Sequence, residues 1–534
     1  MTKHNGHSLA RFVALALTAA LTMASAACGS GQNNGETTSI DTTKLPESSV
    51  AAKSEVVIFT PSDGISISAH TPLNKWAKFV PVLTKALTNA GFLSKNIATK
   101  TDANLTKQSD DVQDYVVNQL SSSSADKDRH TILIVAPATD GNVGNEQYGD
   151  YLTNPVDAPN SDPDNPVSNV AATGASDSAS TQGDADKQQN GSNSKDAAEA
   201  KKRLTKSLKL AQKAGAHTAI LANPLAGFTP DFFVSMSTPR QIGTLQARQL
   251  VSKLALEKTT TNHPKSIEVM LPISDNDNAD DTSREFASEA FKGIWNVLGP
   301  YFKDGRAISP SKTLSGMSTE KDWQAVSFKA SKTSEVRDEL DTRLVGSSKD
   351  AQPHHVDGVI AMNDFVSSAV VDELTSLKYK GSAADINPEI EVSGIVGTLT
   401  GKHNLNRQAV PKPKDDKSAN TNEESEPQMS SDGNMAWPIV TGYGSYVDMI
   451  PDVVNGKQWM TGMENIQKLS RDIASVSSAI EAGKPAAGPS YVKSMSIDGK
   501  ETNVIHEKPM AISAGNLKKT LIEPGYISLA DAGL

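Results

Sequence analysis

Short, largely apolar runs rich in β-branched residues alternate with longer amphipathic patterns along most of this chain. The longer patterns repeat large apolar residues every three or four positions, which gives a helix one face to bury. Buried strands that alternate with such helices predict an α/β fold built around mainly parallel sheets. Strands are expected at 56–60, 131–136, 218–222, 267–271, 356–361 and 438–441.

Four segments carry the helical pattern most clearly. The first opens at Thr71-Pro72, where a cap residue precedes a proline suited to a first helical turn, and its apolar face includes Trp76. The other three are expected around 287–298, 366–377 and 466–480. Ligands of open α/β sheets bind beyond the carboxyl ends of the strands, so the turns after these strands are the first candidates for a site.

The N-terminus has the pattern of a secretory signal at residues 1–27. Lys3 and Arg11 lie in a basic start that precedes a short apolar run, and small residues lead to Cys28, the only cysteine of the chain. A cysteine at the first mature position resembles the bacterial lipoprotein signal, in which the thiol is acylated, although Ser25 stands where that motif usually has leucine. The alternative is a secreted protein with an incidental cysteine. If Cys28 is lipidated, no thiol remains for a disulfide or for catalysis.

Three later segments are too polar to join a core. They are rich in Ser, Thr, Asn, Asp, Gly and Pro, and they cannot bury enough apolar surface to offset the entropy lost on folding. We expect 28–53 to be a flexible tether, and 153–195 and 404–434 to be disordered insertions into the folded body.

Charge and motifs exclude several classes of function. A formal net charge of -10 argues against a nucleic-acid-binding surface. The sequence has no phosphate-binding loop of the GxxxxGK[ST] type, no GxSxG elbow and no HExxH pair, so we expect neither an enzyme nor a cofactor. The acidic run at 275–281 lacks the glycine and glutamate of an EF-hand, since Asp280 and Phe286 stand there, and we expect no metal site.

Several segments, taken in order, carry a resemblance to a known family. Residues 131–140 (TILIVAPATD) and 361–364 (AMND) are similar to its strand-and-turn motifs, and residues 437–442 (WPIVTG) resemble its last lobe-crossing strand. Residues 233–247 resemble the strand and helix that open its second lobe. Together with 208–215, 458–461 and 516–526, these segments resemble the type I periplasmic binding proteins, in particular the xylose and multiple-sugar branch that serves ABC importers.

The resemblance implies two Rossmann-like lobes, joined by hinge crossovers, that close on a ligand. It places the first lobe at 54–226 and the second at 227–443, and it shares 444–534 between them as return segments and a C-terminal tail.

The resemblance also assigns ligand contacts in the first lobe. Lys75 stands where the family usually has arginine, and Trp76 corresponds to a residue that stacks on a sugar ring, although it fits the core face of its helix equally well. Asp140 matches an aspartate near the ligand, with a turn-capping role as the alternative.

In the second lobe, Asn276 and Asn278 lie in a turn similar to one whose asparagine contacts sugar, and Arg284 matches a downstream arginine. Asn363 and Asp364 occupy the best-matched turn.

Two positions depart from the family pattern. Asn223-Pro224 replaces an Asp-Arg pair that clamps sugar hydroxyls at the first crossing, and Tyr443-Gly444 replaces Gln-Asp in the last. The strongest charge-assisted contacts are therefore missing. Either the ligand differs from a simple pentose, with Tyr443 as a second aromatic wall, or binding has weakened or been lost.

These features predict an extracytoplasmic, lipid-anchored binding protein that delivers a sugar or related small solute to an ABC permease in the membrane. The alternative is a surface sensor, adhesin or accessory lipoprotein that keeps the fold without sugar transport. Neither reading involves nucleic acid.

Overall fold

The computed structural model describes residues 50–62, 70–121, 130–138, 147–150, 187–273, 281–346, 352–384, 435–497 and 499–534. All of them belong to one unit of the chain, Leu45–Leu534. Cys28, Asp140, Asn276, Asn278, the acidic run's residues 275–280 and the expected insertion at 404–434 lie outside the described residues.

The first sheet has seven strands in the order β13-β14-β5-β4-β3-β1-β2, all parallel except β13, which runs antiparallel to β14. The expected strands at 56–60, 131–136 and 218–222 are confirmed as β1, β3 and β4. The strands are β1 (Glu55–Pro61), β2 (Ile97–Asp102), β3 (Thr131–Val135), β4 (His217–Leu221), β5 (Phe232–Ser235), β13 (Val492–Ile497) and β14 (Lys500–His506).

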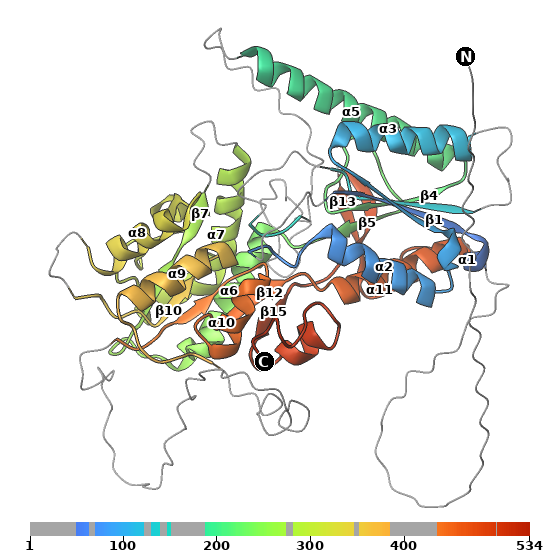
Figure 1. Ribbon diagram of the computed structural model, residues 1–534. Coiled ribbons are helices and arrows are strands. Elements are labelled where there is room, and N and C mark those ends of the chain that lie inside the picture. Colours follow the sequence, from blue (N-terminus) through green and yellow to red (C-terminus); the bar gives the residue numbers. More distant parts are fainter. Residues whose placement is uncertain are drawn as a thin grey trace, which may run out of the picture. The chain divides into compact units, whose positions relative to one another are not determined.

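Helices cover both faces of this sheet (Figure 1). Val56 and Ile58 of β1 point into a core shared with α2 (Trp76–Asn89) and α11 (Ile466–Glu481), and α1 (Val50–Lys53) packs beside α11. Val57 and Phe59 point the other way, into a core shared with α3 (Leu105–Tyr115) and α5 (Lys187–Lys213). Because both faces are buried, β1 needs apolar residues at successive positions.

The second sheet has six strands in the order β15-β12-β11-β10-β6-β8, again parallel except for one edge strand, β15. The strands expected at 356–361 and 438–441 are confirmed as β10 and β11, whereas 267–271 is split between β6 and β7. The strands are β6 (Lys265–Val269), β8 (Ala307–Ile308), β10 (Gly358–Ile360), β11 (Ile439–Thr441), β12 (Met460–Met463) and β15 (Met510–Ser513); β7 (Leu271–Ile273) pairs separately with β9 (Ser327–Lys329).

Helices also cover both faces of the second sheet. α6 (Pro239–Lys253) and α7 (Asp281–Lys303) share one core with β6, and α8 (Thr333–Leu344) and α9 (Asp364–Ser376) share the other with β10 and β11. α10 (Ile450–Asn455) precedes β12. The structure is therefore α/β with two sheets of mostly parallel strands, as predicted.

Along the described residues, the chain passes from one sheet to the other at three places. It leaves the first sheet after β5 and returns after β12, where α11 packs on the first sheet. It leaves the first sheet again between β14 and β15. The first crossing lies after Ser235, later than the expected boundary at 227, because β5 pairs with β4 and β14. The strand at 437–442 is no crossing either, since β11 lies inside the second sheet.

Two helix starts differ from expectation. Helix α2 begins at Trp76, with Lys75 as its extended N-cap residue, so the expected start at Thr71-Pro72 is wrong. The chain before it is held outside the helix, since Leu73 N–H donates to the Gly444 carbonyl at 2.8 Å. Helix α5 begins at Lys187 and so includes the last residues of the segment expected to be disordered at 153–195.

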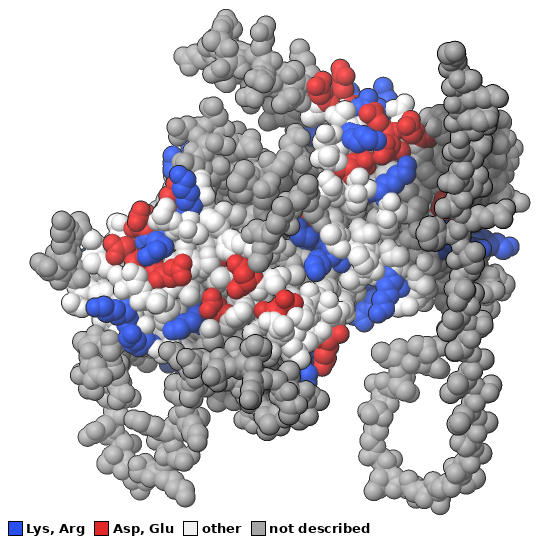
Figure 2. Space-filling model, in the orientation of Figure 1, with Lys and Arg blue, Asp and Glu red and all other residues white. Residues whose placement is uncertain are grey.

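Among the described helices, none combines the length and apolar character that crossing a membrane requires. Acidic and basic side chains are interspersed over the face shown in Figure 2, with neutral residues between them.

Candidate functional site

Polar and aromatic side chains gather where strands of the two sheets end. Ser237 follows β5, Asn363 follows β10, Tyr443 follows β11 and Glu464 follows β12, and all four are fully buried. Carboxyl ends of parallel strands lie at one edge of each sheet, which explains why residues so distant in sequence meet. We call these four residues, together with Asn74, Asp364 and Tyr446, the strand-end cluster.

Asn363 and Asp364 begin α9 and are held in different ways. The Asn363 side chain caps the helix, its Oδ1 accepting from Val366 N–H at 2.9 Å, while its Nδ2 donates to Gln147 Oε1 at 2.9 Å. An asparagine at this position satisfies a helix-end N–H and keeps its amide donor for a second partner.

Asp364 is surrounded by the protein's own donors. Its carboxylate accepts from Tyr446 N–H at 2.9 Å, Gln458 Nε2 at 2.7 Å and Thr461 Oγ1 at 2.8 Å. Burial raises its pKa to about 6, against the lowering effect of these bonds. Asp364 thereby fastens α9 to the segments around β11 and β12.

Tyr443 is fully buried and belongs to an aromatic group with Tyr148 and Phe286. The Tyr148 ring lies 4.6 Å from Phe286 and 6.3 Å from Tyr443, measured between ring centroids. The Tyr443 ring packs closely on β12, where a Cβ on Gly462 would lie 2.6 Å from its Cδ2. Tyr443 therefore packs beside another tyrosine of the same chain, and its role as an aromatic wall for a ligand stays a prediction.

Lys75 and Trp76 lie at the start of α2. Lys75 Nζ forms an ion pair with Asp150 Oδ1 at 2.5 Å. Trp76 is buried in the first-sheet core and meets Phe79 edge-on, with centroids 5.6 Å apart. Of the two roles that the sequence left open for Trp76, the described contacts show core packing, and stacking on a sugar ring stays a prediction.

The other expected contact residues are more scattered. Asn223 follows β4 as a half-buried residue, so it lies at a strand end and precedes the crossing. Arg284 is exposed on α7. Asp140, Asn276 and Asn278 fall outside the described residues. Lys75, Asn363 and Tyr443 each contact a residue of the segment 147–150, and Asp364 is bonded to Tyr446, which also contacts that segment.

Glu464 is the main residue that sequence reasoning missed. Its Oε2 accepts from Ser237 N–H at 2.7 Å and Ser237 Oγ at 2.5 Å, and its own N–H donates to Asn74 Oδ1 at 3.1 Å. Burial raises its pKa to about 7. Its other oxygen, Oε1, is buried without a hydrogen-bond partner among the described residues. A glutamate directly after a short apolar run was the available signal.

Side-chain contacts join the crossings. Ser237 and Glu464 link the first crossing to the second, and Gln241 Nε2 lies 2.7 Å from His506 Nε2, linking the first to the third. Burial lowers the pKa of His506 to about 4, so near neutrality its ring can accept this hydrogen bond.

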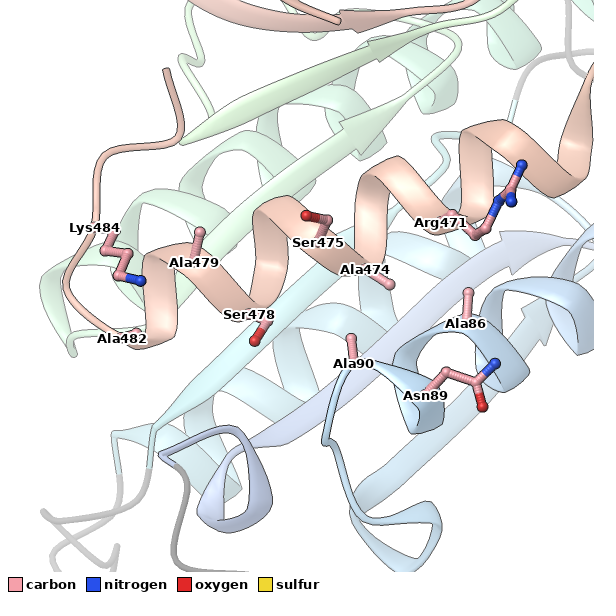
Figure 3. Close-up of a pocket in the computed structure, with 10 residues that line it drawn as sticks. All are labelled: Ala86, Asn89, Ala90, Arg471, Ala474, Ser475, Ser478, Ala479, Ala482 and Lys484. Carbon is pink, nitrogen blue, oxygen red and sulfur yellow. The ribbon is translucent and has the colours of Figure 1, made fainter. Parts of the chain in front are cut away.

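A groove of about 550 Å³ lies elsewhere, between α2 and α11 (Figure 3). It is lined by the later parts of both helices, whereas the strand-end cluster lies beside their first residues. Its lining combines alanines with polar and charged residues: Ala86, Asn89, Ala90, Arg471, Ala474, Ser475, Ser478, Ala479, Ala482 and Lys484.

No family model and no curated protein matches this sequence. Among solved structures, a solute-binding protein of an ABC transporter from Clostridium phytofermentans with bound β-D-glucose is similar, with 16% identity, a TM-score of 0.46, and coverage of 89% of this chain and 99% of that one. A carbohydrate transporter solute-binding protein from Chloroflexus aurantiacus in complex with D-glucose has 14% identity, a TM-score of 0.45, and coverage of 90% and 98%. A sugar ABC transporter protein from Actinomyces odontolyticus has 11% identity, a TM-score of 0.46, and coverage of 88% and 99%.

Proposed function

We propose that this protein is an extracytoplasmic substrate-binding lipoprotein of an ABC transporter, which captures a sugar or related small solute and delivers it to a membrane permease. One observation carries the proposal: two mainly parallel sheets, linked by three described crossings, have polar and aromatic side chains gathered at their strand ends. Ligands of open α/β sheets bind at such ends, and crossings between two lobes permit closure around a solute.

The chemistry of the strand-end cluster suits a hydroxyl-rich solute. Planar amides of Asn74 and Asn363 can pair with neighbouring hydroxyls, and tyrosine rings can cover the C–H face of a sugar. The buried Oε1 of Glu464 has no partner among the described residues, and a solute hydroxyl would supply one.

Further contacts and the anchor are part of the same proposal. We assign ligand contact to residues from both lobes and lipidation to Cys28, which would hold the protein at the outer face of the cell membrane. The proposed contact residues are Lys75, Trp76, Asp140, Asn223, Asn276, Asn278, Arg284, Asn363, Asp364 and Tyr443.

A second candidate is a surface sensor, adhesin or accessory lipoprotein that no longer transports sugar. The specific observation in its favour is that Asn363 and Lys75 are bonded to the protein's own Gln147 and Asp150. Asn223-Pro224 and Tyr443-Gly444 also lack the charged clamp that holds sugar hydroxyls.

Thermal unfolding in the presence of sugars tests the proposal. The full chain is titrated with D-glucose, D-xylose, D-ribose, L-arabinose, D-allose and maltose. At a hundredfold excess over its dissociation constant, a bound sugar should stabilise the fold by about 2.7 kcal/mol.

Asn363→Asp is the informative variant, because it keeps the helix-capping oxygen and loses the amide donor; it should change the sugar response. The matched control, Asn89→Ala in the α2–α11 groove, should leave the response unchanged. No shift with any sugar in the wild type would count against sugar binding and favour the second candidate.

A further inference from the structure

The short turn Gln147–Asp150 contacts segments that belong to both sheets. Gln147 reaches the second-sheet side three times: Oε1 accepts from Asn363 Nδ2 at 2.9 Å, Nε2 donates to the Ala330 carbonyl at 3.2 Å, and its carbonyl accepts from Tyr446 Oη at 2.9 Å. One residue thus takes up the free donor of Asn363, the best-matched ligand position.

Tyr148 fills the space between aromatic residues of the second-sheet side. Its side chain is buried against Phe286 of α7 and near Tyr443. Its carbonyl accepts a hydrogen bond from Asn74 Nδ2 at 3.2 Å, and Asn74 lies just before α2 on the first-sheet side. The ring presents a flat apolar face and a hydroxyl, the two features that a sugar offers to an aromatic site.

Gly149 and Asp150 fasten the turn to the start of α2. Gly149 has φ +112°, and a Cβ there would lie 2.3 Å from Asn74 Cβ, so only glycine permits this approach. Asp150 N–H donates to the Asn74 carbonyl at 2.8 Å, and its carboxylate accepts from Lys75 Nζ and from Trp76 N–H at 3.3 Å. A carboxylate is favoured at this helix N-terminus.

We propose that Gln147–Asp150 is a tethered occupant of the ligand site and that Tyr148 determines its specificity. This inference rests on the proposed function. The turn engages Lys75, Asn363 and the surroundings of Tyr443, all of which are proposed ligand contacts. A solute therefore binds by displacing the Tyr148 ring from between Phe286 and Tyr443.

The Tyr148 ring also defines the class of ligand that can replace it. A solute that replaces Tyr148 must offer a flat apolar face at least as large as a phenol ring, together with hydroxyls for Asn74 and Asn363. Pyranoses and glycosides with an apolar group meet this requirement better than small polyols. The apparent affinity is the intrinsic affinity reduced by the fraction of molecules in which the turn is displaced.

Two variants release the turn in different ways. Tyr148→Ala removes the ring, and Asp150→Ala removes the bonds to Lys75 and Trp76 without emptying an aromatic site. Tyr301→Ala is the control, since Tyr301 lies on α7 outside the cluster, with its ring 4.5 Å from the Arg306 guanidinium. Binding of the same six sugars and of phenyl β-D-glucoside is measured by calorimetry on folded protein, checked by circular dichroism.

The proposal predicts that both release variants bind at least one ligand about tenfold more tightly than the wild type, as removal of a competing conformer requires. Tyr301→Ala should bind as the wild type does. Folded release variants that bind no more tightly than the wild type would overturn the proposal.

If no ligand binds any variant, sugar binding fails, and hydrogen exchange without ligand then decides the role of the turn. Tyr148→Ala should speed exchange both in 71–76 and in 443–446, because the turn holds both segments. Faster exchange in only one of them, or in neither, would show that Tyr148 is an ordinary core residue and would refute the proposal.

Discussion

Glu464 is a buried carboxylate at the point where β12 leads into the second crossing. Burial raises its pKa from 4.5 to about 7, although Ser237 donates two hydrogen bonds to it. The folded state therefore holds this proton more tightly than the unfolded state. The stability that Glu464 contributes is fully present below pH 4.5 and is lost as pH rises through about 7.

We predict that Glu464→Gln makes the protein less sensitive to rising pH. The neutral amide keeps an oxygen for Ser237, so the variant should match the wild type at pH 5 and exceed its stability at pH 8, by an amount on the order of 1–3 kcal/mol. Urea midpoints at the two pH values measure this. Part of the wild-type dependence should remain, because burial also raises the pKa of Asp364 to about 6. Exposed Glu501→Gln is the control, and equal pH dependence of Glu464→Gln and wild type would contradict the account.

At the scale of secondary structure, α6 and α7 pack at glycine contacts. A Cβ on Gly243 would lie 2.1 Å from the Ala290 carbonyl oxygen, and one on Gly293 would lie 2.1 Å from the Arg240 carbonyl oxygen. Backbone atoms cannot yield as a flexible side chain can, so the two helices must approach through residues without side chains.

We predict that Gly243→Ala destabilises the protein by about 1–3 kcal/mol, since it forces apart two helices of the second-sheet core. Exposed Ser252→Ala on the same helix should change stability by less than about 0.5 kcal/mol. Urea unfolding compares the two, and a Gly243→Ala midpoint equal to that of Ser252→Ala would show that the contact relaxes without cost.

Secondary structure also shows why the sequence predicted most strands and helices but misplaced a lobe boundary and a helix start. Period and apolar content identify β1, β3 and β4 because each is buried on both faces. Nothing local says that β5 pairs with β4 and β14, since pairing is a tertiary choice. The Thr71-Pro72 cap signal was overridden for a similar reason: Leu73 bonds Gly444, a residue far along the chain.

The residues of the candidate site also differ in whether the sequence could reveal them. Asn363, Asp364 and Tyr443 could be named as candidates from the sequence because each follows a recognisable strand. Glu464 offered only its position after a short apolar run as a signal, and the importance of Glu464 and Tyr148 comes from partners such as Ser237 and Phe286 that only the folded chain brings near.

At the scale of the whole molecule, the crossings and the turn Gln147–Asp150 both help to hold the two sheets together. Ser237 with Glu464, and Gln241 with His506, fasten one crossing to another. The turn adds bonds to Asn74 on one side and to Asn363 on the other. In our proposal, a solute replaces the contacts that the turn makes with Asn74 and Asn363, and it leaves the contacts between the crossings in place.

Hydrogen exchange of the wild-type protein, with and without a saturating concentration of the sugar that binds best, tests this central claim most directly. We predict that the sugar speeds exchange in Gln147–Asp150, because the turn leaves its place, and slows exchange in 363–366 and 443–446, where the solute takes over the contacts. Exchange in Gln147–Asp150 that is unchanged or slower with sugar bound would contradict the account.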